Sequence, residues 1–392
     1  MPRKKPIPSS EPLPPLLQTR LDVLKAYTAD HAMLLRVDDA LTQAIWEPGG
    51  FAFLLLYGPT GVGKSELLRG VTRRMQSRAR VVTPGDRLPL PVVLVETPAP
   101  FTLREWYERV LRALDEPIIE EPTYREVGTS PNGKRTTSGR GGAKPLDEAP
   151  ELRRAVEVAL AKRRVQALFF DEAQHLMMDG ETQVLRRRWD WLKSLNNTTG
   201  VLLVLAGAYP LLQFRLISGQ AARRGTDLHF PRYQLSNPQD CVAFQGALLA
   251  LLKQACLAVS GREAKTAELQ PLMDHWPLFY AGCLGCVGAF KEWLVRTVAA
   301  ALRKGDARLT LDRVREHELI EASLAQMATD IVAGEQQVAL TGGSREQLHS
   351  LLQIDIEAVP APTSTGEASS TRARRASTRP GTRKPKREAV GE

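Results

Sequence analysis

Short apolar runs alternate with helical patterns along roughly the first half of the chain. The clearest run, residues 51–57, is continuously apolar and is bounded by Gly49-Gly50 and Gly58-Pro59. Similar apolar runs follow at 92–95, 167–170 and 201–206. Helical patterns lie between the runs, at 67–75, 103–114, 152–161 and 184–195. Strands that are apolar on both faces are typical of a parallel sheet covered by helices on each side. The pattern therefore predicts a three-layer α/β domain.

Differences in composition and pattern divide the whole chain into segments. Residues 1–15 are rich in proline and basic residues, which predicts a flexible arm. Residues 16–236 make up the predicted α/β domain, and a Gly-, Pro- and charge-rich segment at about 115–150 interrupts it as a mobile insertion. Helical spacing dominates residues 237–355, which predicts a small helical lid followed by C-terminal helices. Residues 356–392 are rich in Ser, Thr, Pro and Arg, which predicts a disordered basic tail.

The overall composition excludes several classes of protein. With 43% hydrophobic and 25% charged residues, the 392-residue chain is neither collagen-like nor disordered throughout. Its four cysteines are too few for an extracellular disulfide framework. We find no uninterrupted apolar run long enough for a membrane span and no apolar core of a secretory signal near the start, so we expect a soluble, cytoplasmic protein without a membrane partner.

The net charge of +9 suggests nucleic-acid binding, but it belongs to the two ends of the chain. Residues 1–10 and 371–392 together carry all of it, so the intervening residues are neutral overall. A DNA-binding surface on the folded part would therefore have to come from local basic patches.

A phosphate-binding motif follows the first apolar run. It matches G-x-x-x-x-G-K-[ST] with Gly58, Pro59, Thr60, Gly61, Val62, Gly63, Lys64 and Ser65. In this motif backbone N–H groups surround phosphate oxygens, the lysine reaches the β- and γ-phosphates, and the hydroxyl binds Mg²⁺. The motif also opens a predicted helix, whose N-terminus attracts anions. We therefore predict an ATP and Mg²⁺ site made of these residues and the adjoining Glu66.

An acidic pair follows the third apolar run. Asp171 ends that run, at the carboxyl edge of the predicted sheet, and Glu172 comes next. With a phosphate-binding loop nearby, Asp171 is expected to support Mg²⁺ and Glu172 to polarise the attacking water. Gln174 and His175 follow; we treat His175 either as a link between the γ-phosphate and a partner or as an ordinary surface residue.

These motifs, in this order, resemble the AAA+ ATPases of bacterial transposons, the TniB/TnsC type. The resemblance covers about residues 16–320. Besides 54–65 and 168–176, it rests on Gln220-Ala221-Ala222-Arg223-Arg224 with Phe230-Pro231-Arg232-Tyr233, and on Gly282-Cys283-Leu284-Gly285-Cys286-Val287-Gly288. The first two segments indicate only the broad ATPase class, whereas the other blocks look like the transposon group. The resemblance implies a P-loop AAA+ domain with a helical lid.

The resemblance also implies a function shared between copies of the chain. Arg224 corresponds to the arginine finger that completes a neighbour's active site, with Arg223 and Arg232 as alternatives. The implied protein binds double-stranded DNA without sequence preference, forms a hexameric or heptameric ring or a helical filament, and connects a transposase with a TniQ-like targeting protein. It would be associated with the bacterial nucleoid when bound to DNA.

Two departures from the family pattern concern polar sensors of the nucleotide. Residues 203–208, after the start of the fourth run, contain no Asn or Thr where many AAA+ proteins have one. The segment 285–288 lacks the arginine of a Gly-x-x-Arg sensor, unless Lys291 replaces it. We therefore expect slow hydrolysis, with the nucleotide acting more as an assembly switch than as fuel.

Other residues suggest DNA contacts or a metal site. The candidates for DNA phosphates are Arg104, Lys134, Arg135, Arg140 and the run 186–188, which begins with Arg186. Cys283 and Cys286, with His275, Cys241 and Cys256, allow a zinc site, but their spacing favours buried thiols of the lid.

We expect an ATP-dependent regulator of DNA transposition. A replication initiator or helicase loader, and a nucleotide-gated scaffold without DNA, remain the alternatives. We recognise no carboxylate trio or Ser-His-Asp arrangement in the spacing, so nothing in it supports transposase or nuclease chemistry in this chain.

Overall fold

The computed structural model describes residues 11–79, 88–116, 149–178, 182–214 and 224–341. Five short strands form one sheet: β1 (Phe53–Tyr57), β2 (Val92–Glu96), β3 (Ala167–Asp171), β4 (Leu202–Gly207) and β5 (Gly225–His229). The contacts discussed below lie within the compact unit Met1–Val338. This unit contains both the sheet and the helical region after it, so the domain boundary between 236 and 237 stays a prediction.

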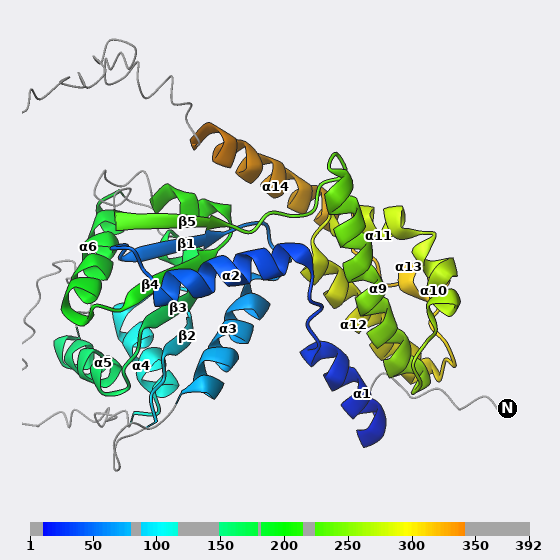
Figure 1. Ribbon diagram of the computed structural model, residues 1–392, viewed down its shortest axis with the longest axis horizontal. Helices are drawn as coiled ribbons and strands as arrows, with labels where there is room; N and C mark the ends of the chain where they lie inside the picture. The colour runs from blue at the N-terminus through cyan, green and yellow to red at the C-terminus, as the bar shows by residue number, and fades with distance from the viewer. Residues whose placement is uncertain (1–10, 80–87, 117–148, 179–181, 215–223, 342–392) are drawn as a thin grey trace, which may run out of the picture. The chain divides into compact units, whose positions relative to one another are not determined.

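Helices surround the sheet and make up the second half of the described chain (Figure 1). Those before and between the strands are α1 (Pro15–Ala26), α2 (Ala32–Trp46), α3 (Lys64–Arg78), α4 (Leu103–Ala113), α5 (Pro150–Lys162) and α6 (Thr182–Thr199), with two 3-10 turns, η1 (Ala173–Leu176) and η2 (Tyr209–Gln213). Those after the last strand are α9 (Pro238–Ser260), α10 (Thr266–Met273), α11 (Trp276–Cys283), α12 (Val287–Lys304), α13 (Leu311–Arg315) and α14 (Glu321–Thr341).

The sheet is parallel and has the strand order β2-β3-β4-β1-β5. β1 lies between β4 and β5, with Tyr57 opposite Gly207 on one side and His229 on the other. Because all strands point the same way, the segments that follow β1, β3 and β4 meet at one edge of the sheet. This edge carries the predicted phosphate-binding loop and the acidic pair.

Alternate residues of the strands enter two separate cores. One core joins one face of the sheet to α2, α3 and the helical region, and its strand residues include Leu54, Leu56, Phe169 and Val204. The other joins the opposite face to α4, α5 and α6, and its strand residues include Phe53, Leu55, Phe170 and Leu203. The predicted three-layer α/β sheet followed by a helical domain is confirmed.

The central helix of the helical region is α9. By length and composition it could cross a membrane, as could α11 and α12 if that bent pair formed one span. In the structure, the apolar residues of α9 that include Phe244, Leu248, Leu251 and Leu252 are buried in the core that α9 shares with α1 and α12. The helix therefore forms part of a packed helical domain.

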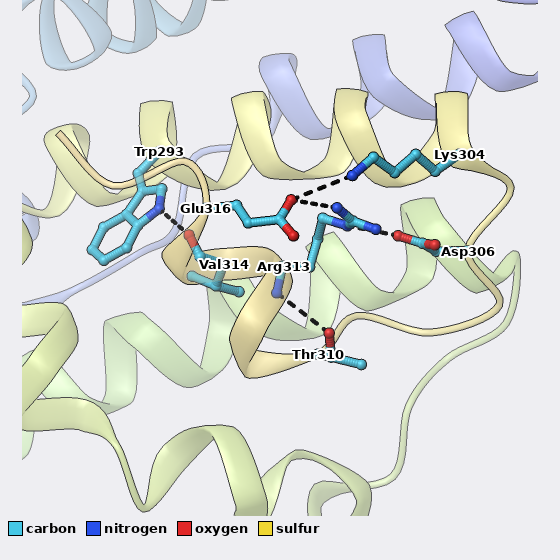
Figure 2. Close-up of polar contacts among 7 residues, drawn as sticks. All are labelled: Trp293, Lys304, Asp306, Thr310, Arg313, Val314 and Glu316. Atoms are coloured by element: carbon cyan, nitrogen blue, oxygen red, sulfur yellow. Dashed lines mark hydrogen bonds and ion pairs between the residues drawn. The ribbon is translucent and has the colours of Figure 1, made fainter. Parts of the chain in front are cut away.

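A polar cluster fastens α13 to the end of α12, as Figure 2 shows. Arg313 Nε donates to Asp306 Oδ2 over 2.8 Å, and the other side of the guanidinium pairs with Glu316. Trp293 Nε1 on α12 donates to the carbonyl oxygen of Val314 over 2.7 Å. These bonds hold the two helices together as one part of the lid.

Within the predicted helical region 237–355, the chain from Leu311 to Thr341 forms two helices, because α13 ends at Arg315 and α14 begins at Glu321. Other predicted segments lie outside the described residues. The segments predicted as the flexible arm, the core of the mobile insertion and the basic tail fall largely or wholly on 1–10, 117–148 and 342–392, which the structure does not describe.

Candidate nucleotide site

Lys64 is the first residue of α3, directly after the loop that follows β1. Its Nζ donates to the carbonyl oxygens of Gly58 and Pro59, both over 2.9 Å. Burial lowers the pKa of Lys64 to about 8, and the negative charges of Glu172 and Asp171 oppose this fall. A buried ammonium group that donates to carbonyl oxygens at a helix N-terminus fits an anionic ligand such as the phosphates of ATP.

The acidic pair lies at the same edge of the sheet. Asp171 ends β3, and its carboxylate accepts hydrogen bonds from the Ser65 hydroxyl and, over 3.0 Å, from the Glu172 amide. Burial raises the pKa of Asp171, and these two hydrogen bonds oppose the rise. Glu172 has a left-handed backbone with φ of 52°, which is uncommon for a residue other than glycine. Ser65 and Asp171 together offer the oxygen ligands that Mg²⁺ prefers.

A cavity of about 590 Å³ joins the loop to the acidic residues and the lid. Its wall includes Gly61, Lys64, Glu172, Gln174, Lys291 and Arg296. The last two residues come from α12, so the lid adds positive charge to a cavity whose floor is the phosphate-binding loop. This size is within the range of pockets that hold small cofactors.

Glu66 connects three parts of the protein at the rim of this cavity. Its carboxylate accepts from the Thr28 hydroxyl over 3.1 Å and pairs with Arg69 over 2.8 Å. Lys291 Nζ of the lid lies 3.6 Å from the same carboxylate. Lys291, proposed from the sequence as a replacement for the missing sensor arginine, is thus placed at the nucleotide cavity.

The lid touches the phosphate-binding loop through its Gly-rich turn. A Cβ atom on Gly288 would lie 2.5 Å from the carbonyl oxygen of Gly61 and 3.3 Å from the amide of Gly63. Only glycine allows two backbones to approach this closely. Gly288 occupies the place of the family's sensor arginine, so its close contact explains why no long side chain can stand there.

Arg224 lies at the opposite edge of the sheet from the nucleotide cavity. It immediately precedes β5, and its carbonyl oxygen accepts from Ala52, which precedes β1. Its guanidinium donates to Asn197 Oδ1 over 2.8 Å. Since a strand rises about 3.3 Å per residue, the length of β1 separates Arg224 from the loop of its own chain by roughly 16 Å. Arg223, the first alternative, lies outside the described residues.

The second alternative finger, Arg232, is already engaged within its own chain. Its Nε and a second nitrogen donate to both carboxylate oxygens of Glu335 over 2.9 and 3.2 Å, and a third bond reaches Tyr280. This bidentate pair connects the segment after β5 to α14. Arg232 therefore serves a structural contact here, and Arg224 stays the predicted finger.

The structure describes four of the DNA candidates, of which Arg104 and Arg186 are exposed near the N-termini of helices that start at the carboxyl edge of the sheet. Arg104 on α4 pairs with Glu108 over 3.2 Å, and Arg186 lies on α6. Arg188 must be withdrawn from the predicted run, because it is buried, donates to the carbonyl oxygens of Leu176 and Met178, and lies over the Phe101 ring. Lys134, Arg135 and Arg140 fall outside the described residues.

The remaining candidates do not form a metal site. Cys283 and Cys286 are buried, and burial raises the pKa of the Cys286 thiol to about 12. Within the described ranges, no group of three His, Cys, Asp or Glu side chains is placed to hold a metal ion. His175 contacts its own turn, with Nδ1 2.9 Å from Met178 Sδ.

Sequence reasoning missed two features of the cavity wall. It did not consider Arg296, which lies one helical turn beyond Glu292 on the side of α12 that faces the cavity. It mentioned Gln174 only as a neighbour of the acidic pair, whereas the side chain reaches from η1 to the end of β4. The feature of the sequence that could have indicated this contact is Gly207, whose missing side chain leaves room for the side chain of Gln174.

The parallel sheet, the helices on both of its faces and the loop 58–65 after β1 have the P-loop AAA+ fold. Residues 50–216 match a family model described as an AAA domain. The resemblance seen in the sequence is thus confirmed for the domain class, while the TniB/TnsC subtype stays a prediction.

Three solved structures show the range of similar folds. The ORC1 protein of Aeropyrum pernix in complex with DNA is 18% identical, with a TM-score of 0.46, over 77% of this chain and 67% of that chain. The ORC2 protein of the same organism is 15% identical, with a TM-score of 0.44, over 79% and 70%. Domain III of the replication initiation protein DnaA of Thermotoga maritima is 11% identical, with a TM-score of 0.43, over 78% and 97%. Comparison with curated proteins finds no match.

Proposed function

We propose that the chain hydrolyses ATP at a site shared between two copies and, in the ATP-bound state, assembles on double-stranded DNA to regulate transposition. The observation that carries this proposal is the division of the site between two edges of one sheet. Lys64 and Glu172 line the nucleotide cavity at the carboxyl edge, and Arg224 stands at the other edge, too far away to serve its own chain.

Each side chain at the carboxyl edge has a separate task. Lys64 binds the phosphates, and their negative charge gives its buried ammonium group a charged partner. Ser65 and Asp171 hold Mg²⁺, which when bound neutralises charge on the phosphates. Glu172 accepts a proton from the attacking water, and its position beside the buried Asp171 keeps it at the cavity wall. Lys291 and Arg296 add positive charge from the lid.

The position of Arg224 implies an oriented assembly. If Arg224 of one copy reaches the cavity of the next, the two contact surfaces differ, and the contact repeats head to tail. Such an interface closes into a ring or continues as a helical filament. An arginine supplied across an interface increases hydrolysis by about 10³–10⁵-fold in other NTPases. Hydrolysis should therefore depend on assembly.

DNA binding rests on the basic side chains that remain exposed at the nucleotide edge. Arg104 and Arg186 both lie in the first half of helices that begin there. Contacts with phosphates position DNA without reading its sequence. Each phosphate contact would steepen the salt dependence of duplex binding by about 0.9 in log–log slope.

The assignment to transposition rests on the sequence resemblance. Two blocks of the resemblance are more specific to the transposon group: the segment with Arg224 and the lid turn 282–288. In the proposed assembly, the first block belongs to one copy and the second to the copy whose cavity Arg224 reaches. A transposase and a TniQ-like targeting protein are the partners that the resemblance implies.

ATP hydrolysis, measured with and without a long DNA duplex, tests the proposal. We expect slow turnover that duplex DNA increases, and DNA binding that requires ATP and weakens with salt. Lys64→Ala should weaken nucleotide binding and prevent assembly, whereas Glu172→Gln should bind ATP and stay assembled on DNA in electron micrographs. Fast turnover by a monomer without DNA would contradict the proposal, and ATP binding without DNA binding would favour a signalling scaffold. Stimulation by a helicase instead of a transposase would favour a replication role.

A further inference from the structure

The side chain of Gln174 connects the proposed general base to a neighbouring strand. Its Nε2 donates a hydrogen bond to Glu172 Oε2. Its Oε1 accepts a hydrogen bond from the backbone amide of Ala208 over 3.2 Å, just past the end of β4. One amide group therefore joins the turn after β3 to the end of β4, the strand between β3 and β1.

The end of β4 is shaped to receive this side chain. A Cβ atom on Gly207 would overlap Gln174 Oε1 and lie 3.1 Å from the backbone nitrogen of Gln174. Any larger residue at 207 would displace the Gln174 side chain. The end of β4, where many AAA+ proteins carry an Asn or Thr, therefore borders a side-chain amide that comes from the turn η1.

Gln174 also faces the site of reaction. It lines the 590 Å³ cavity together with Glu172, Ala208 and the phosphate-binding loop. Glu172 lines the same cavity, and the hydrogen bond from Gln174 restricts the direction of its carboxylate. The bond from Gln174 uses Oε2 and leaves Oε1 available to accept a proton from water.

We infer that Gln174 is a positioning residue that fixes the Glu172 carboxylate for ATP hydrolysis and takes the place of the missing polar residue at the end of β4. This inference rests on the proposed ATP hydrolysis at this site. Gln174 acts through Glu172 and forms no bond with substrate. A misplacement of a reacting group by about 1 Å costs up to a hundredfold in rate, so loss of the amide should lower kcat by about ten- to a hundredfold.

Steady-state ATP hydrolysis by the full-length protein on duplex DNA tests the inference. Gln174→Met keeps the length of the side chain but removes both hydrogen bonds, so kcat should fall while KM and the Kd for ADP stay within about twofold. Gln183→Met, at an exposed position of α6, is the matched control and should keep the kcat of the unmodified protein. An unchanged or higher kcat in Gln174→Met would overturn the inference.

A second variant displaces the side-chain amide of Gln174 without replacing the residue. Gly207→Ala should displace the flexible end of Gln174 while the protein stays folded, and should reproduce the loss of kcat. The double variant Gly207→Ala with Gln174→Met should be no slower than the single variants, because both remove one interaction. Multiplied losses would overturn the inference. If the unmodified protein did not hydrolyse ATP, the proposed function would fail and this inference with it; hydrolysis with no effect of these variants would refute this inference alone.

Discussion

The backbone amide of Ala289 donates a 2.8 Å hydrogen bond to the carbonyl oxygen of Gly61. This bond joins the first turn of lid helix α12 to the loop that would surround the phosphates. The hydrogen bond couples the lid to the loop, so we expect a change at either to alter the affinity for nucleotide. The first prediction tests this contact.

Gly288→Ala should weaken nucleotide binding about tenfold, since the added methyl group would press on the Gly61 carbonyl oxygen and push the lid from the loop. The Kd for ADP, measured by calorimetry, checks this. Gly246→Ala on α9 is the matched control, because a Cβ there meets no atom within 4 Å. It should leave the Kd unchanged and increase helix stability slightly. Equal Kd values for both variants would show that the lid contact does not matter for binding.

Nucleotide affinity should fall as the pH rises above about 8. In the free protein the pKa of Lys64 is lowered to about 8 by burial, and phosphates favour its charged form. Binding therefore takes up a proton near this pH, and the Kd should increase by up to about tenfold per pH unit between pH 8 and 9. Calorimetry of ADP binding at pH 7, 8 and 9 measures both the Kd and the proton uptake.

The matched variant for this prediction is Lys64→Met, which lacks the titrating group. Its weaker binding should be nearly independent of pH over the same interval. A Kd of the unmodified protein that stays constant from pH 7 to 9 would mean that Lys64 remains fully charged without nucleotide.

Protein stability should fall in acid because of His31. Its Nδ1 lies 2.8 Å from the Tyr233 hydroxyl and accepts from the Leu34 amide over 3.3 Å, and burial lowers the pKa of His31 to about 4. The folded state thus binds fewer protons than the unfolded state between about pH 6.5 and 4. The contribution of His31 to stability is full above pH 6.5 and decreases towards pH 4, by up to about 3 kcal/mol.

His31→Asn keeps a side-chain acceptor for the start of α2 but cannot titrate. The difference in unfolding free energy between pH 7.5 and 5, from urea titrations, should be smaller in this variant than in the unmodified protein. The same difference in both proteins would exclude His31 as the source.

Arg313 should matter for lid stability more than a comparable surface arginine. Its side chain is 13% exposed and pairs with both Asp306 and Glu316, whereas Arg262 is 64% exposed in its pair with Glu268. Arg313→Met should lower the melting temperature by about 2–4 °C, and Arg262→Met should have a smaller effect because exposed pairs contribute little. Thermal melts that rank the two variants in the reverse order would contradict this view of the cluster in Figure 2.

The sequence predicted the central strands well, but not the outer strand β5 or the break between α13 and α14. The apolar runs at 51–57 and 201–206 lie within two residues of β1 and β4, because strands buried on both faces are apolar throughout. β5 gave no such signal, since among the described strands it pairs only with β1 and it contains Thr226 and Asp227. The sequence analysis also did not divide the helical region 237–355 into helices such as α13 and α14, because apolar periodicity does not show where a chain turns.

The site was predictable only where a motif is continuous in sequence. The loop 58–65 and the pair Asp171-Glu172 were placed at strand ends by the residues around them. The contact between Gln174 and Gly207, and that between Gly61 and Gly288, join segments that only the sheet order and the lid bring together. Arg188 was misread as a surface charge, because the sequence does not show that Phe101 packs beneath it.

ATP hydrolysis by a mixture of two inactive variants tests the shared site most directly. Glu172→Gln lacks the base but carries Arg224, and Arg224→Ala lacks the finger but carries an intact cavity, so each alone should be inactive in ATP hydrolysis. In an equal mixture about one interface in four would combine both intact halves, and hydrolysis should reappear to a corresponding extent. A mixture as inactive as the separate variants would contradict a site divided between copies of the chain.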